Sequence, residues 1–237
     1  MRRVLSLATV HPDDAVHSFG GTIYTYASSD WDIRCVILTR GEAGNASPDV
    51  RVRETRSALG ILGVPEEHIV FGDYPDTRLE PCHDVIEFLE QAIGLRPDLA
   101  LIPSPYDLHQ DHVAGSLACQ RALRRATTVL MGETPSSSYD FRPEVFISLT
   151  ERALQAKLEA IRCHQTQAHR AYMSPRYVRS LAEVRGWQGR VMYAEAFMPL
   201  RYALVPGGVD VLKPPVQKLE DGLRVRGMGG SGRAPAG

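Results

Sequence analysis

The feature that most constrains this chain is an alternation of short apolar runs with helix-length amphipathic segments up to about residue 130. The apolar runs predict strands at Val4–Val10, Ile33–Thr39, His68–Phe71, Leu99–Pro103 and Thr128–Met131. The segments between them predict helices at Ser18–Ser28, which a glycine pair opens, and at Val50–Leu62, Asp84–Ile93 and His112–Arg125. Connections of this length are typical of right-handed crossovers between parallel strands. We therefore expect an α/β fold, with a Rossmann-like, mainly parallel sheet flanked by helices.

After about residue 130 the pattern changes to a smaller C-terminal α+β part. Strands are predicted at Val145–Leu149 and Ala194–Leu204, and helices at Thr150–Cys163 and Ser174–Trp187. Thr150 is suited to cap the first of these helices, because its hydroxyl can accept a hydrogen bond from a free backbone N–H. Together with the preceding strands and helices, these elements predict a single domain over residues 1–204.

The last part of the chain has a different composition. From Pro206 onward glycine and proline become frequent, and few large apolar side chains remain. Such a segment cannot bury enough apolar surface to offset the entropy of ordering it. Residues 205–237 are therefore expected to form a flexible Gly/Pro-rich tail rather than a second domain.

Composition excludes several classes of protein. A formal net charge of −1 argues against a nucleic-acid-binding protein, which would carry a basic excess. No stretch approaches the ~18–20 apolar residues that a membrane span needs, so no membrane partner is expected. The four cysteines are widely spaced and include no CxxC pair. They are typical of buried, reduced thiols in a cytoplasmic protein.

Two polar clusters follow predicted strands, where ligands bind in open α/β sheets. The first is His11-Pro12-Asp13-Asp14, directly after the first strand. A histidine and a carboxylate three residues apart can reach one metal ion if the loop curves, and proline favours such a curve. Taken alone, this tetrapeptide fits a simple turn with a capping aspartate equally well.

The second cluster, Asp107–His112, follows the Leu99–Pro103 strand and places two histidines three residues apart. Alone, it is typical of polar residues at the start of a helix. Together with the first cluster it is more specific, because His11, Asp14 and His112 form a two-histidine, one-carboxylate set. That set, with an open coordination position, suits a catalytic zinc ion or, less well, a non-haem iron.

The remaining polar residues suggest the chemistry. Zinc brings the pKa of a bound water toward about 7, so a nucleophile is available at neutral pH. Asp13 is placed to take the water proton, and His109 to hold a carbonyl oxygen and protonate a leaving amine. Asp111 is placed to orient one of the histidines, as carboxylates near metal ligands do. An amide is the natural substrate, since its carbonyl must be polarised and its leaving group protonated.

These residues resemble the PIG-L/LmbE family of zinc-dependent N-acetylglucosaminyl deacetylases, over about residues 3–204. The resemblance is carried by His11-Pro-Asp-Asp14 with Gly20-Gly21-Thr22, Thr39-Arg-Gly-Glu-Ala-Gly44, Arg51-x-x-Glu54-x-x-x-Ala58-x-x-x-Leu62-Gly63, Pro75-Asp76, His109-x-Asp111-His112, Lys157-x-x-Ala160-x-x-x-His164-x-Thr166-Gln167 and Ala194-Glu-Ala-Phe197. It implies a single deacetylase domain over residues 1–204.

The resemblance also implies roles for individual residues. It implies one catalytic Zn²⁺ held by His11, Asp14 and His112, with another divalent metal as the alternative. Asp13 would be the general base, and His109 the electrophile or general acid.

Further positions match supporting residues of the family. Asp111 would steer the general acid, and Arg51 and Asp76 would contact sugar hydroxyls or a phosphate-linked aglycone. From the sequence alone, the favoured interpretation is a surface charge on a helix for Arg51 and a turn residue for Asp76. His164 matches a position near the site, although a structural role fits it as well.

The sequence departs from the family at two positions. Many members have a glutamate after the paired aspartates, where this chain has Ala15, a variant that resembles another branch of the family. Some members place a tyrosine two residues before the first histidine of the HxxH motif, where it assists the oxyanion. Here that position is Asp107, with Tyr106 beside it, so assistance from a tyrosine is in doubt. His17 is expected to be a surface or helix-start histidine.

The function expected from these observations is hydrolysis of the N-acetyl amide of a small amino-sugar conjugate. Family members in high-GC bacteria serve low-molecular-weight thiol synthesis and antibiotic tailoring, and the arginine-rich composition favours such a genome. Two alternatives stay open. One is a metal-dependent amidase on a sugar-thiol conjugate or a longer acyl amide, and the other is a non-catalytic sugar-binding homologue. The resemblance leaves a homo-oligomer open. The loops after Pro103 and around Gly132–Tyr139 are expected to shape the aglycone side.

Overall fold

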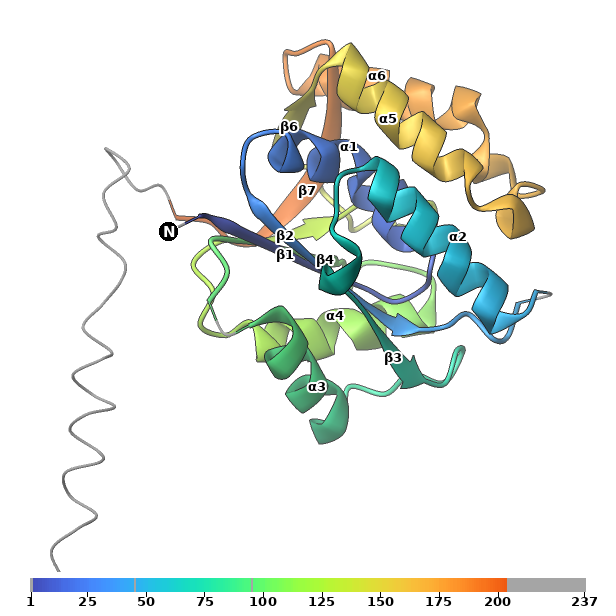
Figure 1. The fold of residues 1–237 in the computed structure, drawn as a ribbon. Coiled ribbons are helices and arrows are strands. Elements are labelled where there is room, and N and C mark those ends of the chain that lie inside the picture. Colours follow the sequence, from blue (N-terminus) through green and yellow to red (C-terminus); the bar gives the residue numbers. More distant parts are fainter. Residues whose placement is uncertain (1, 45, 95, 204–237) are drawn as a thin grey trace, which may run out of the picture. The chain divides into compact units, whose positions relative to one another are not determined.

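The sheet of this protein orders its strands as β3-β2-β1-β4-β5-β7-β6 (Figure 1). The computed structural model describes residues 2–44, 46–94 and 96–203. The first five strands in sequence pair in parallel, whereas β7 runs antiparallel to both β5 and β6. The predicted Rossmann-like sheet with a smaller C-terminal part is confirmed. The strands are β1 (Val4–Thr9), β2 (Asp32–Thr39), β3 (Ile69–Tyr74), β4 (Leu99–Pro103), β5 (Val129–Gly132), β6 (Val145–Leu149) and β7 (Tyr193–Arg201).

Helices cover both faces of the sheet. In Figure 1, α1, α2, α5 and α6 lie on one side, and α3 and α4 lie on the other. The helices are α1 (Asp14–Ala27), α2 (Pro48–Ile61), α3 (His83–Ile93), α4 (Gln110–Ala122), α5 (Glu151–Arg162) and α6 (Pro175–Gln188). Short 3-10 turns occur at Glu66–His68, Gln165–Gln167 and Ala171–Met173.

The alternation of side chains along β1 divides the core into two layers. Leu5 and Leu7 pack with Phe19 and Leu59 on the α1/α2/α5 side. Ala8, one residue after Leu7, belongs to the layer on the α3/α4 side. Because successive strand residues point to opposite faces, a strand covered by helices on both sides must be apolar throughout. This explains why the first strand is readable as a continuous apolar run.

Helix α1 begins earlier than predicted, and its glycine pair lies inside the helix rather than at its start. A Cβ on Gly21 would lie 2.4 Å from Cδ1 of Leu149, and one on Gly20 would lie 3.0 Å from Cγ of Lys157. The two glycines therefore allow α1 to pack closely against α5 and the end of β6. Close packing of α1 against α5 and β6, rather than helix initiation, explains this pair.

A buried ion pair fixes α1 against β7. The Lys157 ammonium lies 2.6 Å from Oε1 of Glu195, and both side chains are nearly inaccessible to solvent. The two carboxylate oxygens of Glu195 also accept hydrogen bonds from the backbone N–H groups of Gly21 and Thr22, at 2.9 and 2.8 Å. A buried charge is tolerated only when it is paired in this way. The pair holds the helix whose first turn enters the candidate site.

The N-cap predicted at α5 is confirmed, since Oγ1 of Thr150 accepts a hydrogen bond from the Ala153 N–H at 3.1 Å. The cysteine prediction is confirmed in part. All four thiols are free, and Cys35 and Cys119 are buried, but Cys82 is exposed and Cys163 is only partly buried. Cys82 immediately precedes α3 in a connecting segment, where no helix or strand covers it.

The described part of the chain forms one compact unit up to Tyr202. The longest helices in that part, α1, α2 and α6, have 14 residues each. None of its helices combines the length and apolar character needed to cross a bilayer. The predicted tail at residues 205–237 lies outside the described residues, so the domain boundary at residue 204 stays a prediction.

Candidate active site

The candidate site lies where the loops after four parallel strands meet. Ligands bind at this edge in open α/β sheets, because the carboxyl ends of the strands and the starts of the helices converge there. The loop after β1 contributes His11 and Asp13, and the loop after β2 contributes Gly41. The loop after β3 contributes Asp76, and the loop after β4 contributes Asp107 and His109.

Three side-chain atoms converge at the centre of this edge. Nδ1 of His11 lies 3.1 Å from Nε2 of His112 and 3.4 Å from Oδ2 of Asp14. Nε2 of His112 lies 3.2 Å from the same Asp14 oxygen. Asp14 stands in the first turn of α1 and His112 in the first turn of α4. The structure thus brings together the three residues that the sequence proposed as metal ligands.

The spacing of these atoms fits a small tetrahedral cation. Zinc binds nitrogen and oxygen ligands at about 2.0–2.2 Å, which places tetrahedral ligand atoms about 3.3 Å apart. The three measured distances bracket that value, and two nitrogens with one carboxylate oxygen form a donor set typical of catalytic zinc. The donor set and its geometry therefore fit the metal that the resemblance implies.

The electrostatics of the three residues also favour a cation. Burial opposes ionisation of Asp14, but the neighbouring His112 and His11 hold the pKa of its carboxyl well below the usual value. Burial likewise opposes protonation of His112, yet the carboxylates of Asp14 and Asp107 raise its pKa to about 9. Negative charge therefore dominates the centre, and a metal ion can replace the protons that it attracts.

His11 is oriented by carboxylates on its far side. Its Nε2 lies 3.2 Å from Oδ1 of Asp76 and 3.6 Å from Oδ2 of Asp111, which leaves Nδ1 directed at the other two candidate ligands. The second oxygen of Asp76 accepts a hydrogen bond from the Ala43 N–H at 3.2 Å. The side chain of Asp76, assigned to the substrate from the resemblance, is thus in contact with the protein on both oxygens. A substrate contact stays a prediction for it.

His112 is oriented by a residue that the sequence reasoning missed. Its Nδ1 lies 3.0 Å from Oδ2 of Asp107, so its Nε2 is left for the metal position. Burial opposes the shift, but hydrogen bonds from His112, Ser136 and Thr134 lower the pKa of Asp107 to about 2. The sequence marked this position only as the place of an absent tyrosine. An acidic residue in the loop that leads to a candidate ligand histidine was the available signal.

The candidate base Asp13 is paired with Arg51. Nη2 of Arg51 donates to Oδ1 of Asp13 at 2.8 Å, and Nη1 donates to the carbonyl of Gly41 at 3.1 Å. Gly41 has φ +69°, and a Cβ there would lie 1.9 Å from Nη1, so only glycine fits. The Arg51 side chain is 6% exposed. It is therefore not the surface charge that the helix position suggested, and its contact with substrate stays a prediction.

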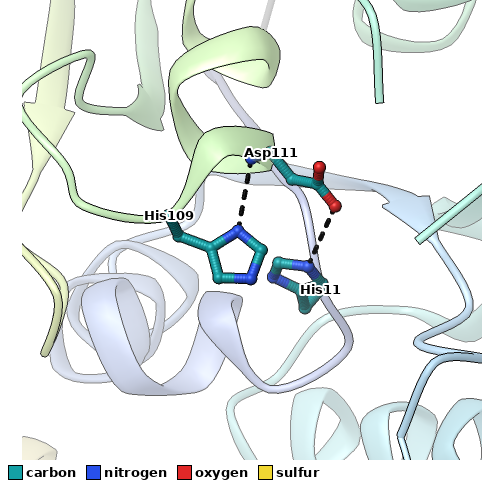
Figure 2. Close-up of side chains that lie close together, drawn as sticks. All are labelled: His11, His109 and Asp111. Carbon is teal, nitrogen blue, oxygen red and sulfur yellow. Dashed lines mark hydrogen bonds and ion pairs between the residues drawn. The ribbon is translucent and has the colours of Figure 1, made fainter. Parts of the chain in front are cut away.

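Figure 2 shows how His109 is held beside the candidate ligands. Its Nδ1 accepts a hydrogen bond from the backbone N–H of Asp111 at 3.2 Å, which leaves Nε2 to carry the proton. The carboxylate of Asp111 turns away from His109 toward His11, and accepts hydrogen bonds from the N–H groups of Thr77 and Leu79 at 2.6 and 3.3 Å. The expectation that this carboxylate steers His109 is therefore corrected. The backbone of Asp111 does so, because the turn that opens α4 directs the carboxylate to the segment after β3.

His109 packs among the other two imidazoles. Its ring centroid lies 4.7 Å from that of His11 and 4.9 Å from that of His112. Burial and the proximity of these two rings lower the pKa of His109. A neutral His109 with a proton on Nε2 is a hydrogen-bond donor toward a substrate oxygen.

His11, His109 and Asp111 form a second group whose ligand atoms lie within 4.8 Å of one another (Figure 2). In this group both Asp111 oxygens and Nδ1 of His109 have backbone partners, whereas in the first group only Oδ2 of Asp14 has one, the His11 N–H at 2.7 Å. We therefore assign the metal position to the group that contains Asp14 and His112.

Two further histidines, His164 and His17, are buried. Neither ring nitrogen of His164 has a hydrogen-bond partner among the described residues. Nε2 of His17 lies 3.3 Å from the Tyr172 carbonyl, and the two rings are in edge contact. The expected position at the start of a helix is confirmed, since His17 lies in the first turn of α1, but the expected surface position is wrong, because the side chain is covered by Tyr172.

The loops expected to shape the aglycone side lie side by side. The Leu108 N–H donates to the Ser136 carbonyl, and the Ser138 N–H donates to the Tyr106 carbonyl, both at 2.9 Å. Leu108 is 79% exposed, and Tyr139 is fully exposed. The two loops therefore form one paired rim next to His109, with large apolar side chains open to solvent.

The donor set at this edge of the sheet defines a candidate metal centre, and comparison with known proteins identifies the chain as a deacetylase by family. A model of the PIG-L family, described as GlcNAc-PI de-N-acetylase, matches residues 7–123. The uncharacterized deacetylase YaiS of Escherichia coli K12 is 33% identical over 163 residues, which cover 66% of this chain and 87% of YaiS. The chain belongs to the PIG-L family of deacetylases.

Solved structures share the fold. The N,N'-diacetylchitobiose deacetylase from Pyrococcus horikoshii superposes with a TM-score of 0.71 at 21% identity, covering 87% of this chain and 88% of that one. The 4-carboxy-2-hydroxymuconate hydratase GalB from Pseudomonas putida KT2440 gives 0.72 at 21% identity, covering 87% and 100%. One of these proteins is a hydratase, so the reaction of this chain must be argued from its site.

Proposed function

We propose that this protein is a zinc-dependent deacetylase that hydrolyses the N-acetyl amide of a small amino-sugar conjugate of the N-acetylglucosamine type. The observation that carries the proposal is the convergence of His11, Asp14 and His112, with Asp13 and His109 in the same loops. The family description, which names an N-acetylglucosamine substrate, supports an amide in an amino sugar as the bond.

His11, Asp14 and His112 would hold the metal, which supplies Lewis acidity toward the acetyl carbonyl and toward water. Asp13 takes the proton of the attacking water. Arg51 occupies Oδ1 of this carboxylate, and no hydrogen bond among the described residues uses Oδ2, which is thus free to act as the base.

His109 is the oxyanion stabiliser of the scheme. Its Nε2–H donates a hydrogen bond to the carbonyl oxygen as that oxygen gains negative charge, which is where a preorganised donor contributes most. Cleavage of the C–N bond requires a proton on the sugar nitrogen, and the proton that Asp13 took from water supplies it. The products are acetate and the free amino sugar. The free amino sugar then enters the synthesis of a low-molecular-weight thiol or of an antibiotic.

A second candidate is hydrolysis of a longer acyl amide or of a sugar-thiol conjugate. The exposed apolar side chains of Leu108 and Tyr139 on the rim beside His109 favour it, since they offer contact to a larger substituent. The two candidates share the metal centre and differ in the acid that is released.

The experiment that tests the proposal is a screen of N-acylated amino sugars with metal-stripped and zinc-loaded protein. Amine release is measured together with the mass of the acid released. Acetate release that depends on zinc supports the proposal, and a larger acid favours the second candidate. Absence of turnover with every N-acyl sugar, despite bound zinc, would contradict both and support a sugar-binding homologue.

A further inference from the structure

Asp107 accepts four hydrogen bonds with one carboxylate. Oδ2 accepts from Nδ1 of His112 at 3.0 Å and from the hydroxyl of Thr134. Oδ1 accepts from the backbone N–H of His109 at 2.8 Å and from the hydroxyl of Ser136 at 2.6 Å. The side chain is fully buried. This residue therefore contacts a candidate metal ligand, the candidate oxyanion stabiliser and the neighbouring loop at once.

The four donors fill the acceptor capacity of the group. An ionised carboxylate offers about four lone-pair positions and no donor. An asparagine at this position would replace one acceptor oxygen by an NH2 group, which cannot accept from the donors on that side. A tyrosine would offer only one oxygen to the four partners. The pattern thus requires an aspartate here, at the position where some members of the family place a tyrosine.

The contacts of Asp107 fix two imidazoles in different ways. At His112 it holds the proton on Nδ1, so the lone pair of Nε2 is left for a metal ion at the position shared with Asp14 and His11. At His109 it binds the backbone N–H, and so sets the start of α4 from which the imidazole projects. A histidine ligand whose other nitrogen is held by a carboxylate is both oriented and made more basic.

The same residue joins the two rim loops. Asp107 pairs with Ser137 as an isolated antiparallel bridge, and backbone hydrogen bonds flank it on both sides. The hydroxyls of Thr134 and Ser136 reach it from the second loop. The position of that loop is therefore tied to the orientation of His112 through one buried carboxylate.

We propose that Asp107 is a positioning residue that fixes His112 for metal binding and holds His109 in register with the 133–138 loop. The role in metal binding stands on the geometry alone. The role toward His109 rests on the proposed deacetylase function, so the test reads both zinc affinity and turnover.

The experiment compares D107A and D107N with wild type in the full chain, with D140N as the matched control. Asp140 lies in the same loop region, but it is exposed and has no hydrogen bond to the site among the described residues. Zinc affinity is measured by competition with a chromophoric chelator, and kcat and KM are measured at saturating zinc. Folding is checked by circular dichroism.

D107A is expected to weaken zinc binding about 10–100-fold, with D107N between D107A and wild type and D140N unchanged. At saturating zinc, kcat should fall more than KM changes. Wild-type zinc affinity in folded D107A overturns the proposal. If D107A does not fold, wild-type affinity in D107N overturns it. Weaker zinc binding in a protein that hydrolyses no N-acyl sugar leaves the proposal standing and rejects the deacetylase function.

Discussion

Arg51 donates a hydrogen bond to Asp13 at 2.8 Å, and both side chains are almost completely shielded from solvent. The pair joins α2 to the loop after β1 and holds one oxygen of the candidate base. A buried guanidinium with two fixed acceptors, Asp13 and the Gly41 carbonyl, defines an orientation that a single ammonium cannot reproduce.

Replacing Arg51 with lysine should therefore lower kcat at least about tenfold, while KM changes little and zinc stays bound. The reason is that lysine keeps the charge but cannot hold Asp13 and Gly41 together. Steady-state kinetics on zinc-loaded protein measure both constants. The matched control is R53K at an exposed position on α2. A rise in KM with unchanged kcat would instead show that Arg51 contacts the substrate.

Replacing Asp13 with asparagine, or His109 with alanine, should reduce turnover at least about 100-fold, which is the usual contribution of a positioned acid or base. Neither residue belongs to the group assigned to the metal, so zinc content should stay near wild type. Metal analysis and acetate release on the same samples separate the two effects. Wild-type turnover in either variant would reject the roles assigned here.

His17 should make the stability of the protein dependent on pH. Burial, together with the nearby Lys157, lowers its pKa from 6.5 to about 4 in the folded state. The unfolded chain binds a proton below pH 6.5 and the folded chain only below about 4, so stability is lost as pH falls through that window. The shift corresponds to about 3 kcal/mol.

The measurement for His17 is urea unfolding at pH 7 and pH 4.5 for wild type and H17Q. Glutamine keeps a donor that can reach the Tyr172 carbonyl but does not titrate. The free energy of unfolding should fall less between the two pH values in H17Q than in wild type. Parallel losses in the two proteins would mean that His17 takes up no proton on unfolding.

Gly21 tests the packing of α1. Alanine there would place its methyl 2.4 Å from Cδ1 of Leu149, so the variant should lose about 1–3 kcal/mol of stability. Gly60, on the exposed side of α2, has no atom within 4 Å of an added Cβ. There, alanine should stabilise by up to about 1 kcal/mol, because it is the better helix former. Thermal unfolding of both variants checks the pair, and equal effects would refute the packing argument.

The parts of this protein that were predictable from sequence depend on local patterns. Strands β1 and β4 consist mainly of apolar residues because helices cover both faces, and the two polar residues of β1, Ser6 and Thr9, are small and buried, so the runs themselves locate the strands. His11, Asp14 and His112 follow strands or open helices at one edge of a parallel sheet, so topology alone brings them near one another. Their distances, and the partners that orient them, needed the structure.

The parts that were not predictable depend on how loops fold back. Asp107 contacts His112 across one turn and the 133–138 loop across about 30 positions of sequence, and no spacing rule encodes either contact. Arg51 and Asp76 were assigned to the substrate from the resemblance, and that contact stays a prediction. What the sequence did not show is that both are held against site residues, since packing of α2 and of the loop after β3 turns them inward.

The central claim, a catalytic metal held by His11, Asp14 and His112, is tested most directly by zinc titration of metal-stripped protein during hydrolysis of an N-acetyl amino sugar. The structure predicts that acetate release is absent without metal and reaches its plateau near one zinc per chain. It also predicts that H112A never reaches that plateau. Acetate release that is unaffected by metal removal, or an H112A variant that responds to zinc as wild type does, would contradict the claim.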